Sequence, residues 1–346
     1  MRTRVFFAAF CLAVAASAQN TIDLNVVVNA KSGPPITGLA QNDFTLLDNK
    51  VPQTIVSFRA LGPGEPVHVI VVVDAVNAPF TSIAYQRGNL DKYLHANGGQ
   101  LTSPTQLAFL TDRGFDLSSS FSTDGNELST ILKQREIGLR DIRRSSQEEA
   151  VDRLSLSINA VRALIAYGAA LPGRKLVLWV SPGWPILSGP LIMLNKKQEQ
   201  QIYGTVQQQQ THDTVRQQRL VYATVVDLST RMREAQIVLY NVNPIGASQD
   251  VGWESYYKAF LKPVTEPVQA VMADLSLQVL AVQSGGLTLV GSNDLTGMLR
   301  QCTEDAKASY QITYTPSEAK GPYHHLEVRL SQPGLTARTR QGCYEK

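Results

Sequence analysis

The chain has 346 residues, of which 43% are hydrophobic and 18% charged, and its formal net charge at pH 7 is +3. This is the composition of a globular protein, long enough for one large core and a second, smaller domain. So small a positive excess offers no electrostatic basis for binding nucleic acid, and we expect no nucleic-acid partner.

Residues 1–18 have the layout of a secretory signal peptide. Arg2 and Arg4 precede roughly 12 apolar or small residues, and the small triplet 16–18 follows. Cleavage before Gln19 would remove two arginines and lower the formal charge from +3 to +1. The apolar stretch is shorter than the ~20 residues of a membrane-spanning helix, and no other segment comes close. We therefore expect an exported protein, periplasmic, secreted or at the cell surface, with no membrane span after cleavage.

Residues 19–62 contain three short alternating runs, 21–30, 43–49 and 54–60, separated by clusters rich in Gly, Pro and Asn. Alternation with a period of two between such turn signals predicts a module of antiparallel strands. About 40 residues are few for an independent core. The Gly- and Pro-rich stretch 61–66 is typical of a linker.

From residue 66 to 308 apolar strands alternate with one-faced helices. Strands such as "VHVIVVVD" and "KLVLWV" are apolar at nearly every position, as in parallel sheets covered by helices on both faces. One long helix and a second helix carry apolar stripes at three- and four-residue steps: Val151, Leu154, Ile158, Val161 and Ile165, then Val268, Val271, Met272, Leu275, Val279 and Val282. The pattern predicts a doubly wound, three-layer α/β domain. A polar, Gln-rich excursion at about 195–219 is expected to be partly helical.

Residues 309–346 return to short strands separated by "SEAKGP" and "QPG". Neither this segment nor residues 19–62 is long enough for a sandwich alone. We expect the two segments to pair into one β-sandwich, with the α/β domain inserted between its halves.

Several pieces of sequence, in this order along the chain, resemble those of a known family. They are "TGLAQNDFTLLDNKVPQTIVSF", "VIVVVDAVNAPF", "RKLVLWVSPG", "IVLYNVNP" and "DAKASYQITYTP". The chain resembles bacterial exported proteins with a von Willebrand factor type A (vWA)-related domain, which are abundant in acidobacteria. The resemblance covers nearly the whole mature chain. It implies a vWA-like sheet with helices, an accessory β module, and a role in binding rather than chemistry.

Typical vWA domains carry a metal-ion-dependent adhesion site, usually for Mg²⁺, which needs several oxygen ligands in near-octahedral geometry. Asp74 aligns with its first aspartate. Val76 and Ala78 then stand where two serines belong, and Pro182 stands where a second aspartate belongs. The resemblance therefore implies a degenerate metal site, and we expect no cofactor.

Two roles remain open for Asp74. Its carboxylate could accept backbone N–H groups of the following turn or cap the next helix, which we favour. Alternatively, Asn77 or a hydroxyl such as that of Ser181 could replace the missing ligands and hold Mg²⁺ or Ca²⁺, as in a divalent-metal-dependent adhesin.

We expect a non-enzymatic binding, adhesion or scaffold protein whose partner is a protein or a cell-surface macromolecule. The residues expected at the binding face, in the loops at the carboxyl edge of the sheet, are Asp74, Asn77, Phe80, Ser181 and Trp184. Trp184 would anchor a partner if it is exposed, but it could also pack under its own loop. A hydrolase with an unrecognised site is a further alternative, although no nucleophile motif is present. His324 and His325 are consecutive in a predicted strand and should point to opposite faces.

Cys302 and Cys343 are the two cysteines that remain after signal cleavage. An exported chain permits a disulfide between them. Cys302 also lies on the apolar stripe of a predicted helix, where a thiol is simply a small core residue. Both alternatives stay open.

Overall fold

The computed structural model describes residues 21–31, 33–62, 64–78, 80–135, 147–184, 210–244, 256–316 and 321–345. The expected signal peptide, residues 1–18, lies outside this part of the chain, as do positions 195–209 of the Gln-rich tract. No helix among the described residues is long and apolar enough to cross a membrane.

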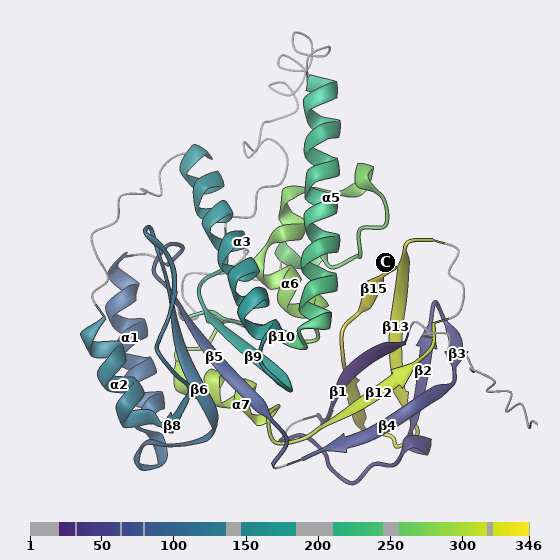
Figure 1. Cartoon of the computed structure of the whole chain (residues 1–346), viewed down its shortest axis with the longest axis horizontal. Helices are drawn as coiled ribbons and strands as arrows, with labels where there is room; N and C mark the ends of the chain where they lie inside the picture. Colours follow the sequence, from purple (N-terminus) through teal and green to yellow (C-terminus); the bar gives the residue numbers. More distant parts are fainter. Residues whose placement is uncertain are drawn as a thin grey trace, which may run out of the picture.

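A mostly parallel sheet forms the centre of the larger domain (Figure 1). The strand order is β11-β10-β9-β5-β6-β7, and β8 pairs with β6. The strands are β5 (Val67–Asp74), β6 (Gln100–Thr111), β7 (Gly114–Leu117), β8 (Ser122–Asp124), β9 (Arg174–Val180), β10 (Ile237–Val242) and β11 (Thr288–Leu289). Only β7 and β8 run antiparallel to their neighbour. The chain builds outward from β5 on one side and from β9 on the other, so these two strands flank the switch point where such sheets bind ligands.

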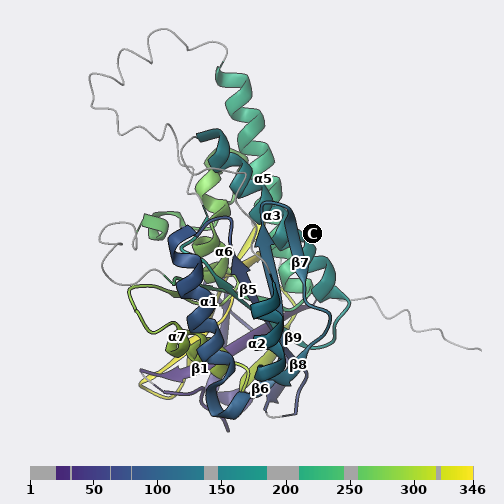
Figure 2. The same cartoon turned by 90° about the vertical axis from the view of Figure 1, so that its left-hand side faces the viewer.

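Helices cover both faces of this sheet (Figures 1 and 2). They are α1 (Phe80–Leu94), α2 (Gly125–Gln134), α3 (Gln147–Ala169), α5 (Gln210–Glu234), α6 (Leu277–Gln283) and α7 (Leu295–Glu304). Ile70 and Val72 of β5 share a core with α3, α5 and α6. Val69 and Val71 share a second core with α1, α2 and α7. Alternate residues of one apolar strand thus serve two helical layers, which explains the continuously apolar sequence.

The predicted helix that carries Val268 to Val282 is only half formed. In place of its first half the chain forms two short 3-10 turns, η4 (Pro267–Gln269) and η5 (Met272–Leu275), before α6. The other 3-10 turns of the described chain are η1 (Gln41–Asp43), η2 (Ala96–Gly99) and η3 (Tyr256–Phe260). The carboxylate of Asp274 accepts the backbone N–H of Val271 at 2.8 Å, which breaks the helical pattern. Val268 is 67% exposed and does not belong to the buried stripe. The second half of the Gln-rich tract, from Gln210, is helical within α5.

Two four-stranded sheets from both ends of the chain form the smaller domain. Their orders are β14-β1-β12-β4 and β15-β13-β2-β3. The strands are β1 (Ile22–Ala30), β2 (Phe44–Asp48), β3 (Val51–Gln53), β4 (Ile55–Leu61), β12 (Ser309–Tyr314), β13 (Tyr323–Leu330), β14 (Leu335–Arg338) and β15 (Gly342–Tyr344). N-terminal β1 and β4 both pair with C-terminal β12, and β2 pairs with β13. The sheets share one core, to which Leu24 and Ile312 contribute from one sheet and Leu46 and Val328 from the other. The predicted fold class, a doubly wound three-layer α/β domain with a β-sandwich built from both ends of the chain, is confirmed.

Candidate functional site

Asp74 is the last residue of β5, at the carboxyl edge of the sheet and beside β9. Its neighbours along the strand, Ile70 and Val72, point into the layer of α3, α5 and α6, and the alternation of a strand places Asp74 on the same face. Trp179 of β9 is the Cα partner of Val72 and belongs to the same core. The strand register therefore brings the indole of Trp179 next to the Asp74 carboxylate.

The Asp74 carboxylate is fully buried and accepts four hydrogen bonds from protein donors. Oδ1 accepts the backbone N–H groups of Val76 at 3.0 Å and Asn77 at 2.9 Å. Oδ2 accepts the Asn77 side-chain amide at 2.8 Å and the Trp179 indole N–H at 3.0 Å. A carboxylate offers about four lone-pair sites, so protein donors use all of them. The backbone bonds are those expected for Asp74 in a tight turn.

Asn77 extends this network to the helix layer. Its side-chain amide also donates to the hydroxyl of Ser157 at 2.9 Å, and this hydroxyl donates to the carbonyl of Arg153 on the same helix, α3, at 2.8 Å. Asp74, Asn77 and Ser157 each have 0% exposure. The loop after β5 is thus tied to β9 on one side and to α3 on the other.

The residues around Asp74 do not fit a divalent cation. Val76 and Ala78, at the two serine positions, are buried apolar side chains. Pro182, at the second aspartate position, presents a carbonyl that accepts the side-chain amide of Gln278 at 3.2 Å. No group of three or more His, Cys, Asp or Glu side chains with metal-binding geometry occurs among the described residues. A cation would have to displace the four N–H donors that already hydrogen-bond the carboxylate oxygens.

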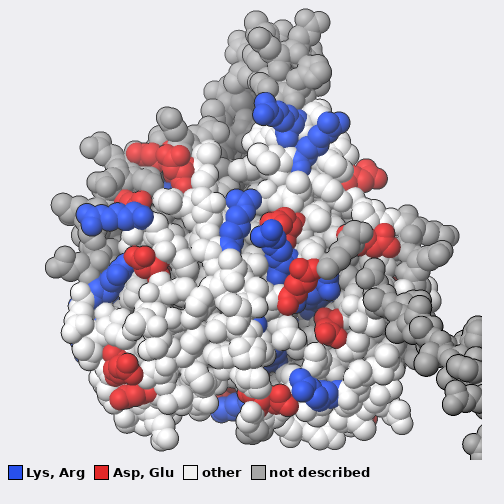
Figure 3. Space-filling model, in the orientation of Figure 1, with Lys and Arg blue, Asp and Glu red and all other residues white. Residues whose placement is uncertain are grey.

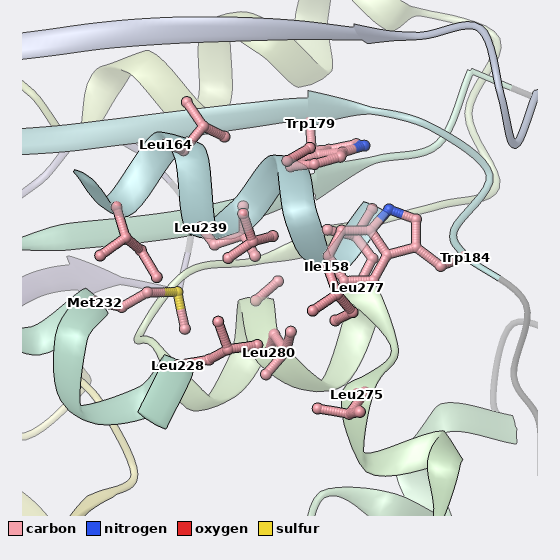
Figure 4. Close-up of a cluster of buried hydrophobic side chains, with 14 of the residues drawn as sticks. Ile158, Leu164, Trp179, Trp184, Leu228, Met232, Leu239, Leu275, Leu277 and Leu280 are labelled. Atoms are coloured by element: carbon pink, nitrogen blue, oxygen red, sulfur yellow. The ribbon is translucent and has the colours of Figure 1, made fainter. Parts of the chain in front are cut away.

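Trp184 is 3% exposed, so of the two alternatives for this residue the structure shows the packed one and not an exposed anchor. Its ring packs edge-on against Trp179 with centroids 5.0 Å apart, beside Ile158 and Leu277 (Figure 4). Gly183 makes this turn possible, because its φ of +109° strains any other residue. The loop after β9 therefore folds down over the Asp74 network, and Trp184 packs under its own loop.

The other expected binding residues are not brought together at a surface. Ser181 is fully buried; its hydroxyl accepts the N–H of Gly183 at 3.2 Å, and its carbonyl accepts the side-chain amide of Asn241 at 2.8 Å. Phe80 opens α1, but its side chain lies outside the described part of the structure. Four of the expected residues are therefore buried beneath the loops at the carboxyl edge of the sheet: Asp74, Asn77, Ser181 and Trp184. None of them has the exposed surface that a direct contact with a partner requires.

Tyr85 is an exposed aromatic residue near this edge that sequence reasoning missed. It is 47% exposed, and its hydroxyl donates to the carbonyl of Asn293 at 3.1 Å, which fixes the ring between α1 and the segment after β11. The helical spacing of the apolar residues could have indicated that Tyr85 is exposed. Ile83, Leu90 and Leu94 form the buried stripe of α1, and Tyr85 falls off that stripe.

The disulfide considered between Cys302 and Cys343 is not formed, and both residues are free, buried thiols. Cys302 lies in the α/β core and Cys343 in the sandwich core. Burial raises the pKa of Cys302 well above its usual value and that of Cys343 to about 11. Thiols held protonated in this way are poor nucleophiles.

His324 and His325 point to opposite faces, as predicted: His324 is buried and His325 is exposed. His324 Nδ1 lies 2.6 Å from Oδ2 of Asp48, which also accepts the hydroxyl of Tyr314 at 3.2 Å. Cys343 stands opposite His324 on β15. Although this places Cys, His and Asp together, they lie in the sandwich core and the thiol has a raised pKa. The cluster gives no support to a hydrolase.

Comparison with known proteins yields distant likeness only. No family model and no curated protein matches the chain. Three of the similar solved structures are the human COPII-coat protein Sec24c, an aerotolerance-related membrane protein from Bacteroides fragilis, and the manganese-loaded TRAP protein of Plasmodium vivax. Their identities are 9%, 9% and 8%, and their TM-scores are 0.33, 0.35 and 0.36. The alignments cover 82%, 70% and 84% of this chain, and 44%, 100% and 98% of the respective neighbours. The chain thus spans less than half the length of Sec24c, and likeness at this level carries no functional argument.

Proposed function

We propose that this protein is a non-enzymatic, exported binding or scaffold protein that contacts another protein or a cell-surface macromolecule through its vWA-like domain, without a metal ion. It would belong to the exported vWA-related proteins that its sequence resembles, and would act in the periplasm, outside the cell or at the cell surface. The observation that carries the proposal is the Asp74 carboxylate, whose lone pairs are all taken by protein donors. A site closed in this way supports recognition by shape and surface chemistry.

The partner would contact the exposed residues at the carboxyl edge of the sheet. Tyr85 is the described anchor there, and Asn293 and Asp294 are exposed beside it. An aromatic ring with a fixed orientation and a polar tip is a common interface residue. On the face shown in Figure 3, cationic and anionic side chains are interspersed, which favours a protein partner over nucleic acid.

A photo-crosslinking amino acid at position 85 tests this proposal in cells that export the protein. We expect a discrete cross-linked partner that persists in EDTA and disappears with Asn293→Ala and Asp294→Ala in the same chain. The control is the same probe at Val56, which is 58% exposed on β4 of the other domain. Equal products at both positions, or a product lost in EDTA, would overturn the proposal.

A further inference from the structure

Arg340 is a buried cation with no anionic partner. It lies between β14 and β15, is 7% exposed, and makes no hydrogen bond or ion pair with the part of the chain that the structure describes. Burial, followed by the nearby charge of Arg233, lowers its pKa to about 10, so the guanidinium stays charged at neutral pH. An uncompensated buried charge is strongly unfavourable, and a counter-charge is therefore expected.

The surrounding side chains do not supply this charge. Arg233 of α5 has an unpaired, buried Nε, and its nearest carboxylate oxygen, on Glu234, is 3.8 Å away at the surface. Asp48 is the buried carboxylate of this region. Its Oδ2 contacts His324 and Tyr314, and its Oδ1 has no hydrogen-bond partner among the described residues, so it bonds neither guanidinium. The charges of Arg233 and Arg340 lower the pKa of the Cys343 thiol and that of Asp48 raises it, so all three groups lie in the neighbourhood of this residue. The region thus holds one buried carboxylate, the buried guanidinium of Arg340 and the part-buried guanidinium of Arg233, which leaves an excess of positive charge.

A small enclosed cavity lies against Arg340. Its walls come from α5, from the end of α6 and from Arg340 itself: Ser229, Met232, Leu280, Gln283, Ser284 and Arg340. It has about 10 Å³ for the centre of a water-sized sphere, enough for one water molecule or one monatomic ion.

The carbonyl groups at the end of α6 are already used. Those of Leu280 and Ala281 accept the N–H groups of Ser284 and Gly286 at 3.0 Å, and that of Gln283 accepts the N–H of Gln341 at 3.3 Å. None of these carbonyl oxygens accepts a hydrogen bond from the Arg340 guanidinium in the part of the chain that the structure describes.

We propose that this cavity binds a single monatomic anion, chloride, held by the guanidinium of Arg340 and by the polar side chains of Ser229 and Gln283. Arg340 belongs to the sandwich, whereas Ser229 and Gln283 belong to the α/β domain. The anion links the two domains across their junction. This assignment is independent of the partner-binding role proposed above.

Thermal unfolding at constant ionic strength tests the proposal. Replacing gluconate with about 200 mM chloride should raise the midpoint of the wild-type chain by about 3 °C, since a ligand bound only by the folded state stabilises it. Arg340→Met should abolish the response to chloride. Arg300→Met, which removes an exposed arginine on α7, should leave the response unchanged. A wild-type midpoint that is equal in both salts, or a full chloride response in Arg340→Met, would overturn the proposal.

Diffraction from wild-type crystals soaked in bromide keeps the test decisive even if Arg340→Met fails to fold. We expect an anomalous peak in the cavity, at hydrogen-bonding distance from the Arg340 guanidinium. Electron density without an anomalous signal would show that water fills the cavity, and the assignment would fail.

Discussion

The indole N–H of Trp179 donates to the Asp74 carboxylate at 3.0 Å across the two strands that flank the switch point of the sheet. A divalent cation at this edge would need free oxygen lone pairs on this carboxylate. Here a neutral donor from β9 and three donors from the loop after β5 satisfy its oxygens instead. The edge of the sheet is held together by hydrogen bonds within the protein, and this relationship can be tested directly.

Trp179→Phe should destabilise the protein much more than Trp184→Phe. Both substitutions remove an indole from the same buried cluster, but only Trp179 has a hydrogen-bond partner, since Nε1 of Trp184 has none. Loss of a donor to a buried charged acceptor costs about 1–3 kcal/mol. Chemical denaturation should therefore give a lower free energy of unfolding for Trp179→Phe by about that amount. Equal losses in the two variants would mean that the bond contributes nothing.

Addition of Mg²⁺ or Ca²⁺ should not stabilise the wild-type chain. Millimolar concentrations of either ion should give no binding heat in calorimetry and no rise in the unfolding midpoint, because the Asp74 oxygens have no free lone pair for a metal. Asp74→Asn provides the control, since it keeps the shape of the side chain and removes its charge. A rise in the midpoint of the wild type that is absent in Asp74→Asn would show that a cation does bind there.

The sequence sufficed to predict the architecture. Continuously apolar strands such as β5 indicate a sheet covered on both faces, and the order of strands and helices along the chain then limits the topology. Neither end segment could bury its apolar face alone, so core size predicted that the two segments pair into one sandwich, but not which strands pair, such as β1 with β12. The predicted helix over Val268 to Val282 was wrong in its first half because its apolar spacing hides the local bond from Asp274 to Val271.

The site itself was only partly predictable. The turn after Asp74 could be inferred from local sequence, and the missing serine positions followed from the resemblance to vWA-related proteins. The bond from Trp179 could not, because it joins residues 105 positions apart and depends on the register between β5 and β9. Burial of Trp184 depends in the same way on α3 and α6, which close over its loop from distant parts of the chain.

Asp274 should make the protein less stable as the pH rises from about 4 to 7. Burial raises its pKa from 3.8 to about 6, so the folded state favours the protonated form, and the stability gained from it is lost as the pH passes through the folded pKa. Asp274→Asn retains an acceptor for the Val271 N–H and removes the charge. Chemical denaturation across this range should show that the free energy of unfolding of the variant, relative to that of the wild type, increases with pH by up to about 3 kcal/mol. The matched change Asp294→Asn, at an exposed helix cap, should not reproduce the trend. A constant difference between Asp274→Asn and the wild type would contradict the prediction.

Asp305→Asn should weaken the junction between the two domains. The Asp305 carboxylate accepts the hydroxyl of Tyr240 at 2.5 Å and pairs with Arg338 of β14, while its carbonyl accepts the guanidinium of Arg174. Removing the carboxylate charge leaves the buried guanidinium of Arg174 and the part-buried one of Arg338 without this counter-charge. Loss of one partner of a buried pair typically costs about 3–5 kcal/mol, and the partial exposure of Arg338 reduces this cost.

The matched control for this change is Glu327→Gln, which removes a carboxylate from an exposed pair with Arg329 on β13, 2.7 Å apart. An exposed pair of this kind contributes little to stability, because water screens the attraction. We therefore expect the unfolding midpoint to fall strongly for Asp305→Asn and little for Glu327→Gln. Hydrogen exchange should also accelerate in β14 and at the end of α7, where the domains meet. If the two variants unfolded at the same temperature, with unchanged exchange at the junction, Asp305 would not hold the domains together.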